Sequence, residues 1–140
     1  MKILLAVDGS AYTKRMLAYL TAHDEWLGAR HEYTLVHAVP AVPSRAAAVI
    51  DKATLKSYYA DSAEQVFKPI RTFLARQGIQ ATCVSKAGPA AELIVAETGR
   101  GRHDLIVMGS HGHGALAQLV LGSVATKVLA KAPVPVLLVR

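Results

Sequence analysis

The sequence predicts an α/β domain in which a parallel sheet of five strands carries helices on both faces. Two expected strands, residues 2–7 and 105–108, are uninterrupted apolar runs, which is typical of central parallel strands covered on both sides. Strand-like and helix-like segments alternate strictly along the chain, and this order favours right-handed crossovers and a doubly wound sheet. At 140 residues, the chain fits a single domain spanning residues 1–140.

The first half of the chain is expected to form two strands and two helices. The strand at residues 2–7 precedes a helix, for which Ser10 is a candidate N-cap and Gly28 the end. A second strand over residues 33–39 stops at Pro40, because proline cannot donate to a strand ladder.

Residues 41–50 form a connector without strong periodicity, which we expect to be the most mobile part of the chain. Residues 51–77 are predicted to form one long helix. Its interior Pro69 predicts a kink near residues 65–69 or a break into two helices. Helical spacing places four aromatic residues on the core face: Tyr58, Tyr59, Phe67 and Phe73.

The second half contributes the remaining strands. Residues 79–86 alternate apolar and polar side chains, which predicts an edge strand, and Pro89 opens a short helix. The apolar run at residues 105–108 is the next strand, and residues 134–139 form the last one.

A glycine-rich loop follows the strand at residues 105–108. Gly109, Gly112 and Gly114 remove side-chain bulk that would keep a ligand off the main chain, and they permit positive φ angles. Ser123 is a candidate N-cap of the last helix. Because free N–H groups and the helix dipole both favour negative charge, the pattern predicts an anion site, with phosphate as the first candidate.

Composition and charge limit the class of protein. With 52% hydrophobic and 19% charged residues the chain is globular, and its single cysteine, Cys83, excludes an intrachain disulfide and fits a reducing cytoplasm. Asp8 interrupts the first apolar run too early for a signal peptide, and no segment reaches the roughly 18 apolar residues of a membrane span. We therefore expect a soluble cytoplasmic protein that does not contact membranes. The net charge of +6 favours anionic partners, but the basic residues are scattered, so we do not expect direct nucleic-acid binding.

The glycine pattern is similar to a known motif. Gly109-Ser110-His111-Gly112, nine residues and Gly122-Ser123 resemble the Gly-x2-Gly-x9-Gly-Ser/Thr motif of the ATP-binding branch of the universal stress protein (UspA-like) family. The segments VDGS, LVHAV, AGPAAELIV and PVPVLLV also resemble that family in order and spacing, so the match covers nearly the whole chain. The resemblance implies a Rossmann-like, adenine nucleotide alpha hydrolase-like fold with strand order 3-2-1-4-5.

This strand order implies where the ligand binds. Strands 1 and 4 would lie side by side where the winding reverses, and open α/β sheets bind ligands at the carboxyl ends of such strands. The resemblance implies that ATP, together with Mg²⁺, is the ligand, with AMP and cyclic nucleotides as alternatives. The expected nucleotide-binding residues are Ala6, Val7, Asp8, Ala38, Met108, Gly109, Ser110, His111, Gly112, His113, Gly122, Ser123 and Val124.

Several of these side chains also have purely structural explanations. Asp8 either accepts a hydrogen bond from the ligand or contacts a metal through water, or it caps the next helix; its position beside the glycine loop favours a ligand role. Ser123 can cap its helix and still contact phosphate. His111 and His113 either donate to phosphate or are solvated, and two histidines without a third ligand do not make a metal site. His37, on a buried strand, is expected to be a core residue rather than a catalyst.

The motif lacks the parts of a fast phosphoryl-transfer enzyme. A Walker A pattern starting at Gly109 would need lysine at Ala115, and only Asp8, His111 and His113 are candidates for positioning a nucleophile. We therefore expect ATP binding with slow hydrolysis or none, in which occupancy serves as a stress-response signal. A weak ATPase or nucleotidyl-transferring enzyme and a dimeric interaction module that binds no nucleotide are the alternatives.

The last strand predicts self-association. At the edge of the sheet, an apolar strand is a template for pairing with another chain. We expect a homodimer through Val136, Leu137, Leu138 and Val139, which the resemblance also implies.

Overall fold

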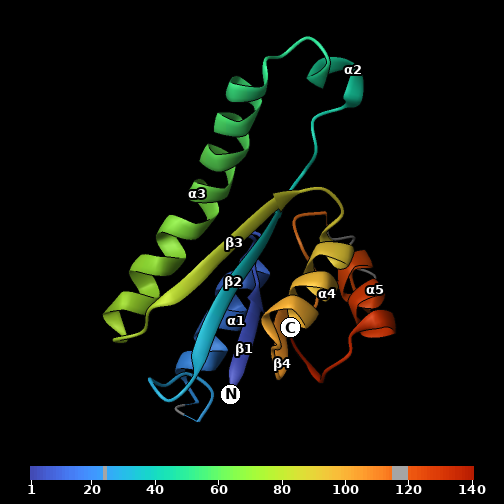
Figure 1. The fold of residues 1–140 in the computed structure, drawn as a ribbon. Helices are drawn as coiled ribbons and strands as arrows, with labels where there is room; N and C mark the ends of the chain where they lie inside the picture. The colour runs from blue at the N-terminus through green and yellow to red at the C-terminus, as the bar shows by residue number, and fades with distance from the viewer. Residues whose placement is uncertain (24, 115–119) are drawn as a thin grey trace.

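A computed structural model describes residues 1–23, 25–114 and 120–140. The strands form a single parallel sheet in the order β3-β2-β1-β4-β5, with helices packed on both faces (Figure 1). The predicted fold class and strand order are therefore confirmed. The strands are β1 (Lys2–Ala6), β2 (Glu32–Val39), β3 (Ala81–Ala87), β4 (Leu105–Gly109) and β5 (Val136–Val139). The helices are α1 (Ala11–Thr21), α2 (Ser44–Ala47), α3 (Lys52–Arg76), α4 (Ala90–Gly101) and α5 (Ser123–Lys131).

The continuous apolar run of β1 supplies two cores, one on each face of the sheet. Because successive side chains of a strand point to opposite faces, Ile3 and Leu5 lie on one side and Leu4 and Ala6 on the other. The first side is covered by buried residues of α1 and α3: Met16, Leu17, Leu20, Ala63, Phe67, Ile70 and Leu74. The second side is covered by α4 and α5 through Ala91, Ile94, Ala125 and Val128.

Strands β1 and β4 end side by side in the middle of the sheet. Leu5 is paired with Val107, and Ala6 with Met108. From this point the chain leaves β1 toward α1 on one face and leaves β4 toward α5 on the other. This is the switch point at which open α/β sheets bind ligands.

Helix α1 is shorter than predicted, since it ends at Thr21 and not at Gly28. The hydroxyl of Tyr33 accepts a hydrogen bond from the Gly28 amide at 2.9 Å, and it lies 2.9 Å from the carbonyl oxygen of Trp26. These contacts hold the segment after the helix in turns against the start of β2. Turns therefore lie between the end of α1 at Thr21 and Gly28, and the glycine does not mark the end of the helix.

Helix α3 runs unbroken through Pro69, so the predicted break into two helices is wrong. Proline removes one backbone hydrogen bond, but the neighbouring Phe67 and Ile70 are each only 4% exposed. Packing against the sheet therefore holds both sides of the proline in one helix. At 25 residues α3 is the longest helix, yet in the described parts of the chain no helix combines the length and apolar character needed to cross a bilayer.

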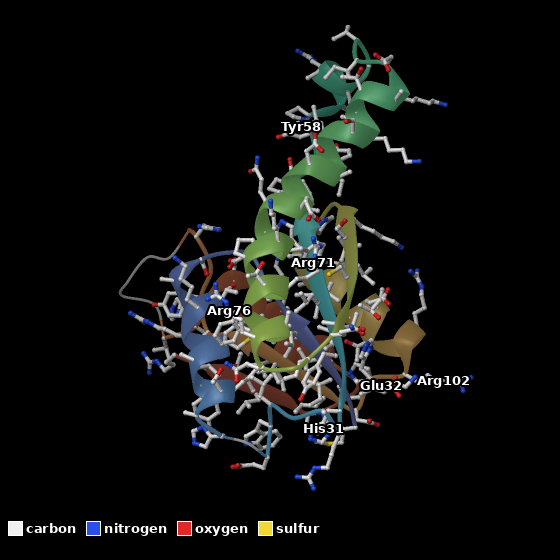
Figure 2. The ribbon with its side chains drawn as sticks, turned by 90° about the vertical axis from the view of Figure 1, so that its left-hand side faces the viewer. His31, Glu32, Tyr58, Arg71, Arg76 and Arg102 are labelled. Atoms are coloured by element: carbon white, nitrogen blue, oxygen red, sulfur yellow. The ribbon has the colours of Figure 1, made fainter. Side chains whose placement is uncertain are left out.

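The first part of α3 projects beyond the sheet together with α2, as Figures 1 and 2 show. No residue of α3 before Ala63 is buried. Tyr58 is 53% exposed, so its predicted place in the core is wrong, while Tyr59 accepts a hydrogen bond from the Val42 amide at 2.9 Å. The connector without strong periodicity, which we expected to be the most mobile part of the chain, contains α2 and is joined to α3 by this hydrogen bond.

Candidate functional site

A cavity of about 440 Å³ opens at the carboxyl ends of β1, β2 and β4. Every predicted nucleotide-binding residue lines it except Ser110, which is completely buried beneath the loop. The lining also includes residues outside the predicted nucleotide-binding set: Thr13, Val36, His37, Ala90, Ile94, Gly114 and Ala125. The cavity therefore brings together segments from both halves of the chain.

The turn after β1 holds Asp8 in a fixed orientation. Its carboxylate Oδ1 accepts hydrogen bonds from the Ser10 amide and from the Thr13 hydroxyl, both at 2.9 Å. Thr13 Oγ1 in turn accepts from the Asp8 amide at 3.1 Å. Asp8 is therefore part of the start of α1, and its second oxygen, Oδ2, faces Gly112 in the glycine loop.

The surroundings of Asp8 favour its charged form. Burial acts to raise the pKa of this carboxyl, but the hydrogen bonds from Ser10 and Thr13 and the charge of His113 outweigh it, so the pKa lies below its ordinary value. The carboxylate thus stays ionised across the physiological range. Among the described residues it is the single carboxylate of the lining, which contains no lysine or arginine.

The loop glycines allow close approach of one part of the chain to another. A Cβ atom at Gly109 would lie 2.6 Å from Tyr12 Cβ, and one at Gly112 would lie 2.7 Å from Asp8 Oδ2. A Cβ at Gly122 would lie 3.1 Å from both His111 Cα and the Ser110 carbonyl oxygen. Among the described residues, the glycines with positive φ angles are Gly9, Gly78 and Gly88, so the loop glycines do not use the conformational freedom that they permit. Residues 115–119, within the nine-residue spacer of the motif, lie outside the described residues.

Helix α5 begins without a side-chain cap. Its N-cap is Gly122, in an extended conformation, and Ser123 is the first helical residue, so the prediction of Ser123 as N-cap is wrong. The Gly122 amide instead donates to the Ser110 carbonyl oxygen at 2.8 Å and closes the base of the loop. Since the first amides of a helix have no partner within it, the uncapped start of α5 presents N–H donors at the edge of the cavity.

The histidines of the site have different surroundings. His111 Nδ1 lies 2.9 Å from the hydroxyl of Ser110, and its ring centroid lies 4.9 Å from that of Tyr12. His113 Nε2 lies 2.6 Å from the carbonyl oxygen of Asp8. His37 is 8% exposed with Nδ1 2.8 Å from the Val7 carbonyl oxygen, which confirms it as a hydrogen-bonded core residue.

The sequence pattern could have pointed to some of the lining residues outside the predicted set. Thr13 lies three positions after the N-cap Ser10, where a hydroxyl can reach back to the turn. Ala90 and Ile94 belong to α4, whose start at Gly88-Pro89 was predicted, but only the packing of α4 on the second face brings them to the cavity. Within the described residues, no group of three or more histidine, cysteine or acidic side chains is arranged to hold a metal ion.

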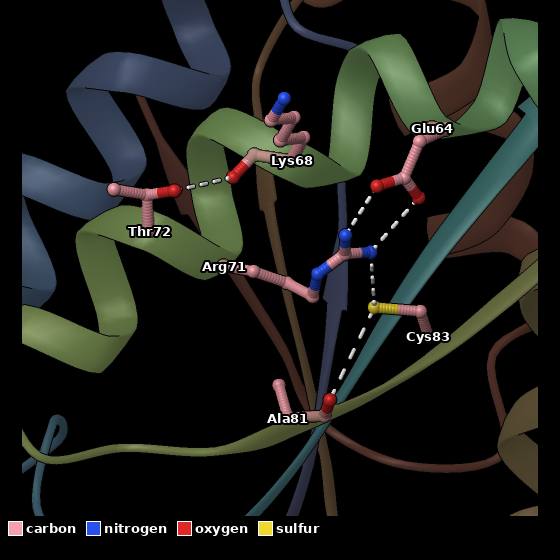
Figure 3. A network of polar contacts seen from close by, with 6 residues as sticks. All are labelled: Glu64, Lys68, Arg71, Thr72, Ala81 and Cys83. Carbon is pink, nitrogen blue, oxygen red and sulfur yellow. Dashed lines mark hydrogen bonds and ion pairs between the residues drawn. The ribbon is translucent and has the colours of Figure 1, made fainter.

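The only cysteine takes no part in this site. Figure 3 shows Arg71 of α3 forming an ion pair with Glu64 and reaching Cys83 of β3, with a 4.0 Å separation between Arg71 Nη1 and Cys83 Sγ. The hydrogen bonds to Glu64, and secondarily to Cys83, raise the pKa of Arg71, while Arg71 lowers that of Glu64. This network joins α3 to the edge strand β3, and none of its members lines the cavity.

Solved structures share the fold. The protein MJ0577 is 28% identical, with a TM-score of 0.81 over 99% of this chain and 94% of that chain. A universal stress protein of Arabidopsis thaliana with AMP bound is 15% identical, with a TM-score of 0.70 over 99% of this chain and 90% of that one. The universal stress protein of Archaeoglobus fulgidus in complex with dAMP is 19% identical, with a TM-score of 0.69 over 100% and 98% of the two chains.

Sequence comparison gives the same family. A universal stress protein of Thermus aquaticus is 38% identical over 140 residues, which cover 99% of this chain and 97% of the relative. The family model described as "Universal stress protein family" matches residues 1–140. With the strand order, the glycine loop and these matches in agreement, the chain belongs to the universal stress protein family.

Proposed function

We propose that this protein binds an adenine nucleotide in the cavity, that the nucleotide is ATP with Mg²⁺, and that its occupancy acts as a signal in the response of a cytoplasmic protein to stress. The observation that carries the proposal is the cavity itself, which joins the glycine loop, the Asp8 turn and the uncapped start of α5 at the switch point. Its volume of about 440 Å³ lies in the range of about 300 to 1,000 Å³ typical of small-molecule sites.

The lining suits the two chemical halves of a nucleotide. Apolar side chains from strands β1, β2 and β4 and from helices α4 and α5 offer surface for a planar base: Ala6, Val36, Ala38, Ile94, Met108 and Val124. The loop amides and the start of α5 offer N–H donors for phosphate oxygens. The AMP and dAMP complexes of the structural neighbours support an adenine nucleotide as the ligand class.

The charge of the cavity supports a magnesium ion as part of the ligand. A triphosphate brings several negative charges into a lining that, among the described residues, contains Asp8 and no lysine or arginine. Mg²⁺ offsets that charge and retains several of its waters. Because Oδ1 of Asp8 is occupied by Ser10 and Thr13, Oδ2 is the oxygen that fits a water-mediated contact.

The same lining supports slow hydrolysis or none. Fast phosphoryl transfer needs cations around the transferred group and a residue that positions the nucleophile. Among the described lining residues, the histidines and Asp8 are the titratable groups, and both loop histidines already contact the protein. If the protein is a weak ATPase, ADP will accumulate when it is incubated with ATP and Mg²⁺.

A homodimer through β5 completes the proposal. β5 lies at the edge of the sheet beside β4, and Val136, Leu137 and Leu138 are only partly buried in the single chain. An exposed apolar edge pairs readily with a second strand. Sedimentation velocity across a range of protein concentrations tests this: a single monomeric species at every concentration would contradict it.

The nucleotide proposal is tested by calorimetric titration of nucleotide-stripped protein with ATP, with and without Mg²⁺. We expect saturable binding with Kd around the micromolar level in the presence of Mg²⁺. Asp8→Asn should weaken it about tenfold or more, because Asn keeps the acceptor at Oδ1 but replaces the charged Oδ2 by a donor. Asp51→Asn is the matched control, since Asp51 also accepts hydrogen bonds at a helix start, but outside the cavity.

Glycine substitutions are a poorer choice for this test. A Cβ at Gly122 would press on the backbone of Ser110 and His111, so a loss of binding could reflect a displaced loop. Absence of binding by folded wild-type protein, with no retained nucleotide in its mass spectrum, would overturn the proposal and favour a dimeric interaction module.

A further inference from the structure

In the described part of the glycine loop, a long-range hydrogen bond joins His113 to the residue that follows the end of β1. His113 Nε2 lies 2.6 Å from the carbonyl oxygen of Asp8, although the two residues are 105 positions apart. A carbonyl oxygen can only accept, so the hydrogen must be on Nε2 of the ring. The side chain of His113 is otherwise exposed, and its bond therefore joins a surface loop to the central strands.

Asp8, whose carbonyl oxygen accepts this bond, is itself held by other hydrogen bonds. Asp8 is held on its other side by the Ser10 amide and the Thr13 hydroxyl, which fix its carboxylate. One residue before His113, the missing side chain of Gly112 lets the loop approach within contact of Asp8 Oδ2. The loop therefore meets the Asp8 turn at two consecutive residues.

The base of the loop is fastened separately. The Ser110 amide donates to the Val139 carbonyl oxygen, and the Gly122 amide donates to the Ser110 carbonyl oxygen, both at 2.8 Å. These bonds hold the loop to the end of β5 and to the start of α5. The hydrogen bond from His113 to the Asp8 carbonyl oxygen joins the same loop to the end of β1.

We infer that His113 is a positioning residue: it holds the glycine loop against the Asp8 turn, so that the loop amides are in place before a ligand arrives. The inference rests on the proposed nucleotide function and assigns His113 a role different from that of a phosphate donor. A loop that is already ordered does not have to be ordered by the ligand, and this saving increases affinity.

The test compares His113→Ala, His113→Gln and wild type in titrations with ATP and Mg²⁺. Loss of one hydrogen bond should weaken binding about three- to tenfold in His113→Ala. His113→Gln should restore most of the affinity, because the side-chain amide nitrogen of glutamine can donate to the same carbonyl. His23→Ala is the matched control, since His23 Nδ1 also lies 2.8 Å from a backbone carbonyl, that of Tyr19, outside the cavity.

A second measurement needs no nucleotide. At about pH 8.5, where an imidazole is neutral, long-range ¹H–¹⁵N correlation of ligand-free protein should show His113 with its hydrogen on Nε2. The Nδ1–H tautomer, unchanged affinity in His113→Ala, or failure of His113→Gln to restore binding would each overturn the inference. If wild type binds no nucleotide, the proposed function fails, whereas the tautomer still reports independently on the bond.

Discussion

The two helix layers of this protein begin their helices in different ways. On one face of the sheet, α1 and α3 start with side-chain caps: Ser10 accepts from the Thr13 amide, and Asp51 accepts from the Thr54 amide. On the other face, α4 and α5 start at Pro89 and Gly122 with no side-chain hydrogen bond. Both uncapped starts line the cavity.

This difference shows at which helix starts the backbone N–H groups are left for a ligand to bind. The first amides of every helix lack partners within the helix, and a side-chain oxygen normally satisfies one of them. In the capped layer the chain supplies that oxygen itself. In the uncapped layer the donors surround a cavity, where oxygens of a ligand can take the same place.

The largest effect is expected where the glycine loop meets the capped layer, at Gly109. A Cβ there would lie 2.6 Å from Tyr12 Cβ in the first turn of α1, so Gly109→Ala should lower the free energy of unfolding by about 1–3 kcal/mol. Gly114→Ala is the matched control, because no atom of the described residues, its chain neighbours apart, lies within 4 Å of its added Cβ, and we expect a change within about 0.5 kcal/mol. If urea unfolding gives the same loss of stability for both variants, the close approach of Tyr12 does not explain why residue 109 is glycine.

A smaller effect should separate the two kinds of helix start. Asp51→Ala removes a cap and should lower stability by about 1 kcal/mol while leaving nucleotide affinity unchanged. Ser123→Ala, at the uncapped start of α5, should change stability by less than about 0.5 kcal/mol and should weaken nucleotide binding. Thermal unfolding measures the stability of each variant, and calorimetry measures its nucleotide affinity. Weaker binding by Asp51→Ala, or a larger loss of stability in Ser123→Ala, would contradict the proposed difference between the two kinds of helix start.

The smallest effect concerns the acid side of the pH range. The folded-state pKa of Asp8 lies below its ordinary value of 3.8, since hydrogen bonds outweigh burial, so the unfolded state takes up the proton first as the pH falls. The stability that Asp8 contributes is therefore complete above that ordinary value and is lost as the pH falls through the folded-state pKa. Asp8→Asn should flatten the decline in stability as the pH falls below about 4; an unchanged slope would contradict this role.

Most of the fold could be predicted because the sequence carries its determinants locally. Residues 3–6 of β1 and 105–108 of β4 are all apolar, a pattern typical of strands covered on both faces. Strand order came from a family resemblance that rests on the spacing of Gly109, Gly112 and Gly122. The binding residues predicted from the same resemblance all line the cavity except Ser110, but Val36 of β2 and Ala90 and Ile94 of α4 were not predicted.

The predictions that failed concern features that the residue pattern alone does not determine. Hydrogen-bonded turns lie between the end of α1 and Gly28, and the Gly122 amide donates to Ser110 while Gly122, and not Ser123, is the N-cap of α5. Helical spacing placed Tyr58 correctly on a face, but that part of α3 extends beyond the sheet it would pack against. His113 was a candidate phosphate donor in the sequence, and only the folded chain reveals its bond to Asp8.

The projecting start of α3 gives one helix two levels of stability. From Lys52 to Ser62 no side chain is buried, so opening this segment breaks helical hydrogen bonds and the bond between the Tyr59 hydroxyl and the Val42 amide, whereas from Ala63 to Leu74 the helix cannot open without exposing the core. Amide hydrogen exchange should therefore divide α3 within a few residues of Ala63, with rapid exchange before it and slow exchange after it. The outer turns can unwind and re-form repeatedly while the sheet and its cavity stay intact.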